Sequence, residues 1–283
     1  MSIEVRNLTH IYSEGLPHES TAIEDVSFTA EDGQLVGIIG HTGSGKSTLV
    51  QHLNGLLKPK SGQIIVSGQD ITAEGVPMRD IRRKTGLVFQ YPEYQLFEET
   101  VAKDVAFGPA NLGLSQEEID FRVREAIEMV GLDYESVKNL SPFDLSGGQK
   151  RRAAIAGVIA MKPEVLILDE PTAGLNPKAH ADILDMVETI HRRESNIIFL
   201  VSHNMNDIAR MSDKVLVMNR GRLAMDGTPE EVFSREEELS SMGLALPDSM
   251  VIASALRKAG MDIRKSCLTM DEAADEIAKV LTK

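Results

Sequence analysis

The sequence feature that most constrains the fold is a glycine-rich loop between an apolar segment and a helical pattern. The loop reads Gly40-His41-Thr42-Gly43-Ser44-Gly45-Lys46-Ser47 and fits G-x-x-x-x-G-K-[ST]. Apolar residues fill 35–39 before it, and leucines at helical spacing follow it. Glycines let backbone N–H groups converge on a phosphate, and a helix start favours an anion. We therefore expect a nucleotide-binding loop in which Lys46 reaches the β- and γ-phosphates and Ser47 coordinates Mg²⁺.

The other apolar segments predict an α/β fold with a parallel sheet. Residues 165–168 and 197–201 are short apolar runs typical of strands buried on both faces, and a helical pattern lies between them. Residues from about 92 to 160 carry helical patterns without a strong strand and predict a helical insertion. Further strands are predicted at 3–8 (an edge strand), around 26–28, and at 215–218 before a hairpin turn.

The pattern changes again near residue 244. A helix is predicted after Pro247, with Val251, Ile252 and Leu256 on one face, and Thr269–Glu272 reads as a capping box that starts a second helix. We expect one main domain at 1–243 that contains the helical subdomain at about 92–160. Residues 244–283 are expected to form a C-terminal helical appendage.

Charge and composition exclude some functions. The formal net charge of −13 opposes binding to nucleic-acid phosphates, and the basic runs 82–84 and 150–152 are too short to form a convincing patch. No apolar run approaches the roughly 18 residues that cross a bilayer, and the N-terminus does not resemble a signal peptide. The single cysteine, Cys267, fits a reducing compartment. If the protein acts at a membrane, another chain is expected to cross it.

Two further motifs bear on the chemistry. Asp169 and Glu170 follow an apolar strand, so Asp169 is expected near the Mg²⁺ and Glu170 near an attacking water. Ser146-Gly147-Gly148-Gln149 follows Leu145 and predicts a second anion-binding turn at a helix start, although a purely structural turn is the alternative. One nucleotide does not readily need two such turns from one chain.

With these motifs in this order, residues 1 to about 240 resemble the ABC ATPase family. Ser47 and Ser146 lie 99 positions apart, Gly148 and Asp169 lie 21 apart, and Glu170 and His203 lie 33 apart. The resemblance implies a P-loop NTPase with a RecA-like parallel sheet core, a small antiparallel β subdomain and a helical subdomain. It also implies two modules facing head to tail, with each ATP between the phosphate loop of one module and the 145–149 signature loop of the other.

The resemblance assigns individual roles. Tyr12 matches the aromatic residue that stacks on adenine, Gln90 matches the glutamine that touches Mg²⁺ and the water, and His203 matches the histidine that contacts the γ-phosphate. Asn176 stands where the family usually has Asp, which puts the details of signalling across the dimer in doubt. The implied catalytic residues are Gln90, Glu170 and His203; the implied Mg²⁺ contacts are Ser47, Gln90 and Asp169; the implied ATP contacts are Tyr12, Gly40, His41, Thr42, Gly43, Ser44, Gly45, Lys46, Ser47, Thr48, Ser146, Gly147, Gly148 and Gln149.

Residues 90–101 and 104–109 are similar to the energy-coupling factor (ECF) importers of bacteria and archaea, which take up vitamins and transition-metal ions. The similarity is to the second of two paralogous ATPases, and 15–17, 151–157 and the C-terminal appendage agree with it. It implies a peripheral protein on the cytoplasmic side of the cell membrane. The implied partners are a paralogous ATPase (a homodimer being possible), an integral-membrane T component and a substrate-binding S component. Glu93, Glu98 and Glu99 form either a solvated face or an acceptor for a basic coupling helix of the T component.

Other functions remain as alternatives. A conventional ABC importer or exporter ATPase would share the same motifs. A soluble ABC-type ATPase acting on DNA or ribosomes is disfavoured by the acidic charge, the single module and the short gap between loop and signature. A regulator without turnover is disfavoured because both Glu170 and His203 are present.

Overall fold

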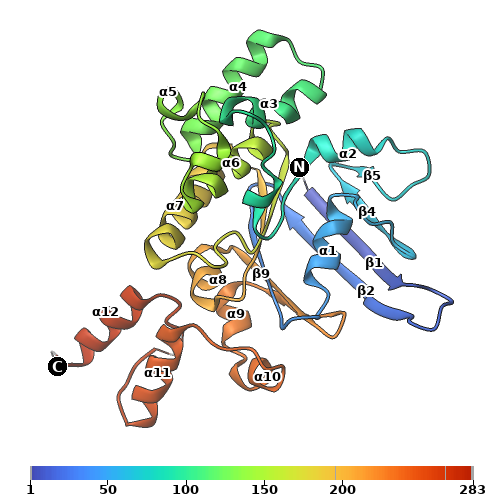
Figure 1. The fold of residues 1–283 in the computed structure, drawn as a ribbon. Coiled ribbons are helices and arrows are strands. Elements are labelled where there is room, and N and C mark those ends of the chain that lie inside the picture. Colours follow the sequence, from blue (N-terminus) through green and yellow to red (C-terminus); the bar gives the residue numbers. More distant parts are fainter. Residues whose placement is uncertain (1, 195, 265, 282–283) are drawn as a thin grey trace.

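The computed structural model describes residues 2–194, 196–264 and 266–281, which form two sheets surrounded by helices (Figure 1). The larger sheet has six strands in the order β10-β9-β3-β8-β7-β6. Its strands β3, β6, β7, β8 and β9 are parallel, and β10 pairs antiparallel with β9. The predicted α/β fold with a parallel sheet is confirmed. The strands are β3 (Leu35–Ile39), β6 (Thr85–Val88), β7 (Val165–Asp169), β8 (Ile197–Val201), β9 (Lys214–Asn219) and β10 (Arg222–Gly227).

Alternate side chains of the central strands enter two separate cores. In β3, Leu35 and Ile39 pack on one side of the sheet, and Val36 and Ile38 pack on the other. All residues of β3, β7 and β8 are buried, which explains why these strands are continuous apolar runs rather than alternating ones. The carboxyl ends of the parallel strands share one edge, where the loops that follow them meet.

The smaller sheet is antiparallel and has the order β2-β1-β4-β5. The expectation that residues 3–8 form an edge strand is wrong, because β1 pairs with β2 on one side and with β4 on the other. The alternation of Ile3, Val5 and Leu8 correctly marks a strand with one buried face, but it carries no information about neighbours along the sheet. The strands are β1 (Ser2–Tyr12), β2 (Ser20–Glu31), β4 (Ser61–Val66) and β5 (Gln69–Asp70).

The helices between β6 and β7 pack together at the top of Figure 1. In α4, Ile119, Val123 and Ile127 are buried at helical spacing, as the sequence predicts. Thr100 caps the start of α3 and Ser115 caps the start of α4. Each side chain accepts a hydrogen bond from the backbone N–H three residues further on. The elements are η1 (Pro92–Gln95), α3 (Val101–Asn111), α4 (Gln116–Met129), α5 (Tyr134–Val137), η2 (Pro142–Asp144) and α6 (Gly147–Ile159).

The remaining helices cover the large sheet and its edges. α7 buries Ile183, Val187 and Ile190, the residues whose spacing predicted it. Within the described ranges, no helix is both long and apolar enough to span a bilayer. These helices are α1 (Lys46–Leu53), α2 (Met78–Lys84), α7 (Pro177–Glu194), α8 (Met205–Met211), α9 (Pro229–Phe233) and α10 (Glu236–Ser241).

The C-terminal residues form two helices, α11 (Asp248–Lys258) and α12 (Met270–Leu281), with an apolar cluster of their own. The helix predicted after Pro247 is present. Of the residues predicted to share one face, Val251 is 51% exposed, Ile252 is 37% exposed, and Leu256 packs against the cluster. Met250 and Ala253 are buried.

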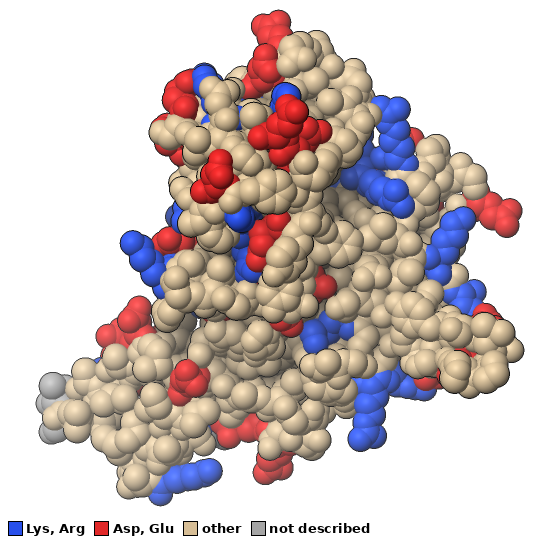
Figure 2. All heavy atoms as spheres, in the orientation of Figure 1, with Lys and Arg blue, Asp and Glu red and all other residues tan. Residues whose placement is uncertain are grey.

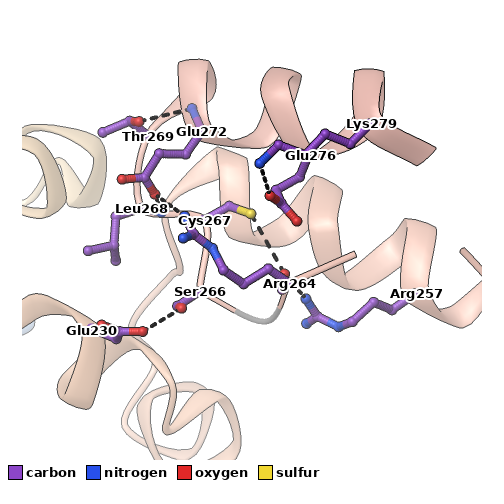
Figure 3. A network of polar contacts seen from close by, with 10 residues as sticks. All are labelled: Glu230, Arg257, Arg264, Ser266, Cys267, Leu268, Thr269, Glu272, Glu276 and Lys279. Carbon is purple, nitrogen blue, oxygen red and sulfur yellow. Dashed lines mark hydrogen bonds and ion pairs between the residues drawn. The ribbon is translucent and has the colours of Figure 1, made fainter. Parts of the chain in front are cut away.

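The predicted capping box at the start of α12 is only half formed (Figure 3). Thr269 Oγ1 accepts a hydrogen bond from the Glu272 backbone N–H at 3.2 Å. The Glu272 carboxylate, however, accepts from the Leu268 N–H at 2.9 Å and from Arg264 at 3.2 Å rather than from Thr269. Glu272 thereby ties the helix start to the segment that connects α11 and α12.

Candidate active site

The phosphate loop connects β3 to α1, and its glycines are required by their surroundings. A Cβ on Gly40 would lie 2.3 Å from the Met218 carbonyl oxygen, and one on Gly45 would lie 2.7 Å from the Ala22 carbonyl oxygen. Gly43 and Gly45 have φ values of 79° and 103°, which side-chain-bearing residues rarely adopt. These close approaches bring the loop against β9 and β2 and fix its shape.

The end of the loop has backbone N–H groups available to bind an anion. Gly45 is the N-cap of α1 and contributes no side-chain bond, so its first-turn N–H groups have no side-chain cap. Lys46 Nζ donates to the carbonyl oxygens of Gly40 at 2.6 Å and His41 at 3.1 Å, and so lies along the loop. Burial lowers the pKa of Lys46, while the nearby charges of Glu170 and Asp169 act in the opposite direction.

The two predicted carboxylates leave β7 in different directions. Asp169 is buried; burial and the Glu170 charge raise its pKa, while the neighbouring Ser47 hydroxyl acts in the opposite direction. Glu170 has φ 50°, and its N–H donates to the Val201 carbonyl at 3.0 Å. This left-handed backbone turns Glu170 away from the strand, at a cost on the order of 1 kcal/mol that the surrounding bonds offset.

The three predicted catalytic residues lie together, with Gln90 and His203 both in contact with Glu170. Its Oε2 accepts from Gln90 Nε2 at 3.3 Å and contacts His203 Nδ1 at 3.1 Å. These residues follow β6, β7 and β8, which are neighbours in the sheet. The Glu170 side chain is 20% exposed and that of His203 is 70% exposed, so both can reach a bound molecule at this edge.

Other predicted nucleotide contacts lie around the same loop. Tyr12 is partly exposed, and its hydroxyl lies 3.3 Å from Thr48 Oγ1 on α1. His41 bonds the Thr42 carbonyl through Nδ1 and Asn219 through Nε2, while Ser44 is fully buried beneath the loop. The sequence did not point to Asn219, which anchors the loop from the end of β9.

The signature residues are placed apart from the phosphate loop. Ser146 is the N-cap of α6 and forms a reciprocal capping box with Gln149. The glycines between them line a recess of about 550 Å³ that contains none of the phosphate-loop residues. A Cβ on Gly147 would meet nothing within 4 Å, and one on Gly148 would meet only Ala179 at 3.9 Å. Packing within this chain therefore does not explain why these positions are glycine.

Arg151 joins helix α6 to two loops of the site, a role that the sequence did not reveal. Its side chain is 2% exposed and forms a bidentate pair with Glu93 at 2.7 and 3.0 Å. It also donates to the carbonyls of Pro171 at 3.0 Å and Ala173 at 2.7 Å, just after the catalytic carboxylates. Arg151 thus links α6 to the segment after Gln90 and to the segment after Glu170.

Asn176 performs the helix capping for which Asp is also suited. Its side-chain oxygen accepts from the Ala179 backbone N–H at 3.0 Å at the start of α7. The amide therefore keeps the local geometry without the negative charge.

A groove of about 680 Å³ lies between α2 and α3, away from the phosphate loop. Aromatic side chains, among them Phe89, Phe97 and Phe107, line it, and Arg79, Arg82 and Arg83 extend along its α2 side. Figure 2 shows the basic side chains gathered over α2 beside this hollow.

The acidic residues predicted to form a solvated face or a partner site are only partly accessible. Glu93 is 18% exposed and paired with Arg151, and Glu99 is exposed but paired with Lys103 at 2.6 Å.

Comparison with known proteins identifies the family. The model of the family described as ABC transporter matches residues 23–173. A protein of Caldanaerobacter subterraneus called energy-coupling factor transporter ATP-binding protein EcfA2 is 56% identical over 99% of this chain and 98% of its own length. The chain belongs to the ABC transporter ATPases. A Clostridioides difficile protein of the same name as that relative is 55% identical over 99% of this chain and 98% of its own length.

Solved structures agree with this membership. CbiO1 from Clostridium perfringens, part of the ABC transporter complex CbiONQ, has a TM-score of 0.74 at 37% identity over 84% of this chain and 93% of its own. A dimeric ATP-binding cassette in a post-hydrolysis state with ADP and Pi has a TM-score of 0.71 at 27% identity over 80% of this chain and 98% of its own. This ABC transporter ATPase is therefore an ATP-binding subunit of the ECF type, and its ATP hydrolysis is coupled to transport.

Proposed function

We propose that the chain is one of two paralogous ATPases that power an ECF importer of vitamins or transition-metal ions. The observation that carries the proposal is the convergence of Gln90, Glu170 and His203 at the sheet edge that also holds Lys46 and Asp169. ATP hydrolysis needs positioning and charge stabilisation more than covalent chemistry, and these groups supply both.

The residues at this edge suit Mg²⁺ as the ion that accompanies ATP. The Ser47 hydroxyl lies near the Asp169 carboxylate, whose raised pKa it partly counteracts, and Gln90 adds an amide oxygen near Glu170. Such hard oxygen donors are the ligands that Mg²⁺ prefers, and it is commonly held by one or two protein groups together with phosphates. Bound there, Mg²⁺ would neutralise phosphate charge. In this proposal Ser47 and Asp169 hold it.

The proposed hydrolytic step assigns separate tasks to the protein groups. Glu170 orients the attacking water and accepts its proton, while Gln90 and His203 fix the direction of that carboxylate. Lys46 leaves the carbonyls of its own loop to stabilise the β- and γ-phosphates, and the N–H groups at the start of α1 bind the β-phosphate. Tyr12 stacks on the adenine.

The signature turn is proposed to act on the nucleotide of a second ATPase subunit. Ser146, Gly147, Gly148 and Gln149 stand at the start of a thirteen-residue helix whose dipole favours an anion. The glycines lack an explanation within the chain, and a close approach by another molecule supplies one. A paralogous chain is the favoured second subunit, and a homodimer is the alternative.

We assign the groove between α2 and α3 to the membrane partner. Its aromatic lining would accept the apolar face of a coupling helix from an integral-membrane T component, and a separate S component would choose the cargo. Because Glu93 is paired with Arg151 and Glu99 with Lys103, Glu98 is the acidic contact that we assign to that helix. The exposed Val251 and Ile252 of α11 are proposed to help pair the two ATPases at the cytoplasmic side of the membrane.

Purification of the tagged chain in mild detergent, with the co-purifying chains identified by mass spectrometry, tests this assignment. We expect a paralogous ATPase, a multi-spanning membrane protein and at least one small, very hydrophobic protein. Recovery of a homodimer with a conventional permease would move the chain to another transporter class. Recovery with ribosomes or DNA alone would refute the importer assignment while leaving the ATP chemistry intact.

A further inference from the structure

The segment that carries His203 is held by a contact from the C-terminal helices. His203 stands between the end of β8 and the start of α8, and its own side chain is mostly exposed. Its neighbours are tied to the helix start: Ser202 Oγ accepts from the Asn204 N–H, and Asn204 Oδ1 accepts from the Asn206 N–H, each at 3.0 Å. The position of His203 is therefore set by the position of α8.

α8 depends on its surroundings for stability, and it packs Met205, Ile208 and Ala209 into the core that also contains Leu35 of β3. It has seven residues, well below the roughly 12 that a helix needs for marginal stability in isolation. Two polar contacts fix its first turn from outside. On one side Asp207 contacts His180 of α7 at 3.0 Å. On the other side Asn206 and Asp248 exchange two hydrogen bonds of 2.9 Å each. Asn206 Nδ2 donates to the Asp248 carboxylate, and the Asp248 N–H donates to Asn206 Oδ1.

Asp248 is the first residue of α11. This helix packs partly against the core of the main domain and partly against the small C-terminal cluster. Met250 is buried in the main core together with Leu244, while Ala253 lies in the small C-terminal cluster. The exposed Val251 and Ile252 follow Asp248 within about one helical turn. A partner that binds the outer face of α11 and shifts this helix would therefore also shift Asp248 and its hydrogen bonds to Asn206.

We propose that Asn206 and Asp248 are positioning residues for His203, through which the C-terminal helices set the activity of this chain's own ATP site. Neither residue touches the nucleotide; the pair fixes α8, and α8 fixes the backbone of His203. The inference rests on the proposed role of His203. It adds a catalytic consequence to a part of the chain to which only subunit pairing has been assigned.

The test is steady-state ATP hydrolysis by the full-length chain in its transporter complex, with kcat and KM measured separately. His203→Ala gives the kcat that remains when this site lacks its histidine, which is the lower reference value. Asp248→Ala and Asn206→Ala each remove accepting groups of the pair, and we expect either to lower kcat about three- to ten-fold toward that reference value, as the loss of about one or two hydrogen bonds permits. KM for ATP and the affinity for a fluorescent ADP analogue should stay within about two-fold, because no nucleotide contact is removed.

A swapped pair separates positioning from general damage. Asn206→Asp places two carboxylates opposite each other and should lower kcat. Adding Asp248→Asn to it restores both hydrogen bonds: the side chain at 248 now donates to the side chain at 206, and the backbone N–H of residue 248 donates as before. This double variant should return kcat to near the wild-type value. Asp271→Ala, in the first turn of α12, is the matched control for loss of an exposed aspartate at a helix start, and it should leave kcat unchanged. The mass of the complex checks assembly in every variant.

The outcomes distinguish the inference from the proposed function. If His203→Ala lowers kcat but Asp248→Ala and Asn206→Ala do not, the inference is overturned and the role of His203 stands. If His203→Ala leaves kcat unchanged, the proposed role of His203 fails and the inference fails with it. A loss in the single variants that the swapped pair does not restore, or that Asp271→Ala reproduces, also overturns the inference.

Discussion

Replacing Arg151 with methionine should destabilise the protein far more than the same change at the adjacent Arg152. Methionine keeps much of the buried volume but leaves the Glu93 carboxylate without its bidentate partner and the carbonyls of Pro171 and Ala173 without a donor. Removing one member of a buried ion pair costs about 3–5 kcal/mol. Each orphaned carbonyl adds on the order of 1 kcal/mol. We expect the free energy of unfolding to fall by about 5–7 kcal/mol, a large share of the roughly 5–15 kcal/mol typical of a domain.

Urea unfolding followed by far-UV circular dichroism measures this loss, since the chain has no tryptophan to report by fluorescence. Arg152→Met is the control: its side chain is 22% exposed and contacts Asp182 at only 3.3 Å, so the expected loss is below about 1 kcal/mol. In the Arg151→Met background, Glu93→Gln should recover part of the lost stability, because it removes the carboxylate that was left without a partner. Equal losses in Arg151→Met and Arg152→Met would refute the reasoning.

Three further predictions concern the ATP site. Glu170→Gln should retain ATP binding but slow hydrolysis by about 100-fold or more at this site, measured as single turnover in the assembled complex; near-normal turnover there would contradict its proposed role. Lys46→Ala should weaken ATP binding at least about ten-fold in a titration, because a buried cation beside the phosphates is lost. Asp169→Asn should abolish Mg²⁺-dependent hydrolysis yet raise the melting temperature at pH 7. Because burial raises the pKa of Asp169, its charged form destabilises the fold at neutral pH. The increase in melting temperature over the wild-type chain should shrink as the pH falls through that raised pKa, and it should vanish below about pH 3.8, the ordinary pKa of an aspartate. An increase that persists at low pH would argue against this cause.

The parts of the site that the sequence predicted are those encoded by short contiguous patterns. The phosphate loop and the strand that ends at Asp169 are each local, and their buried strands bring them to the same sheet edge. Similarity to known ATPases then supplied Tyr12, Gln90 and His203, which no local pattern distinguishes from structural residues.

The features that the sequence did not predict depend on distant partners. Arg151 bonds residues 58, 20 and 22 positions away, and nothing near it in the chain marks it as buried. The interior place of β1 depends on β4, which begins about 50 residues later. The buried face of α11 could not be predicted from its apolar pattern, because Met250 packs into one apolar cluster and Ala253 into another.

The order of strands in the large sheet has a consequence for biosynthesis. β3, which leads into the phosphate loop, lies between β8 and β9 in the described sheet, and the residues of both partners are synthesised more than 150 positions later. At about 5–20 residues per second, the nascent strand waits on the order of ten seconds for its first neighbour. Until residue 219 has left the ribosome, a chain that already contains every residue of the phosphate loop lacks the sheet that shapes it. The nucleotide site is thus among the last parts of the main domain to fold, and a ribosome stalled before β8 would present an apolar strand to chaperones rather than a site to ATP.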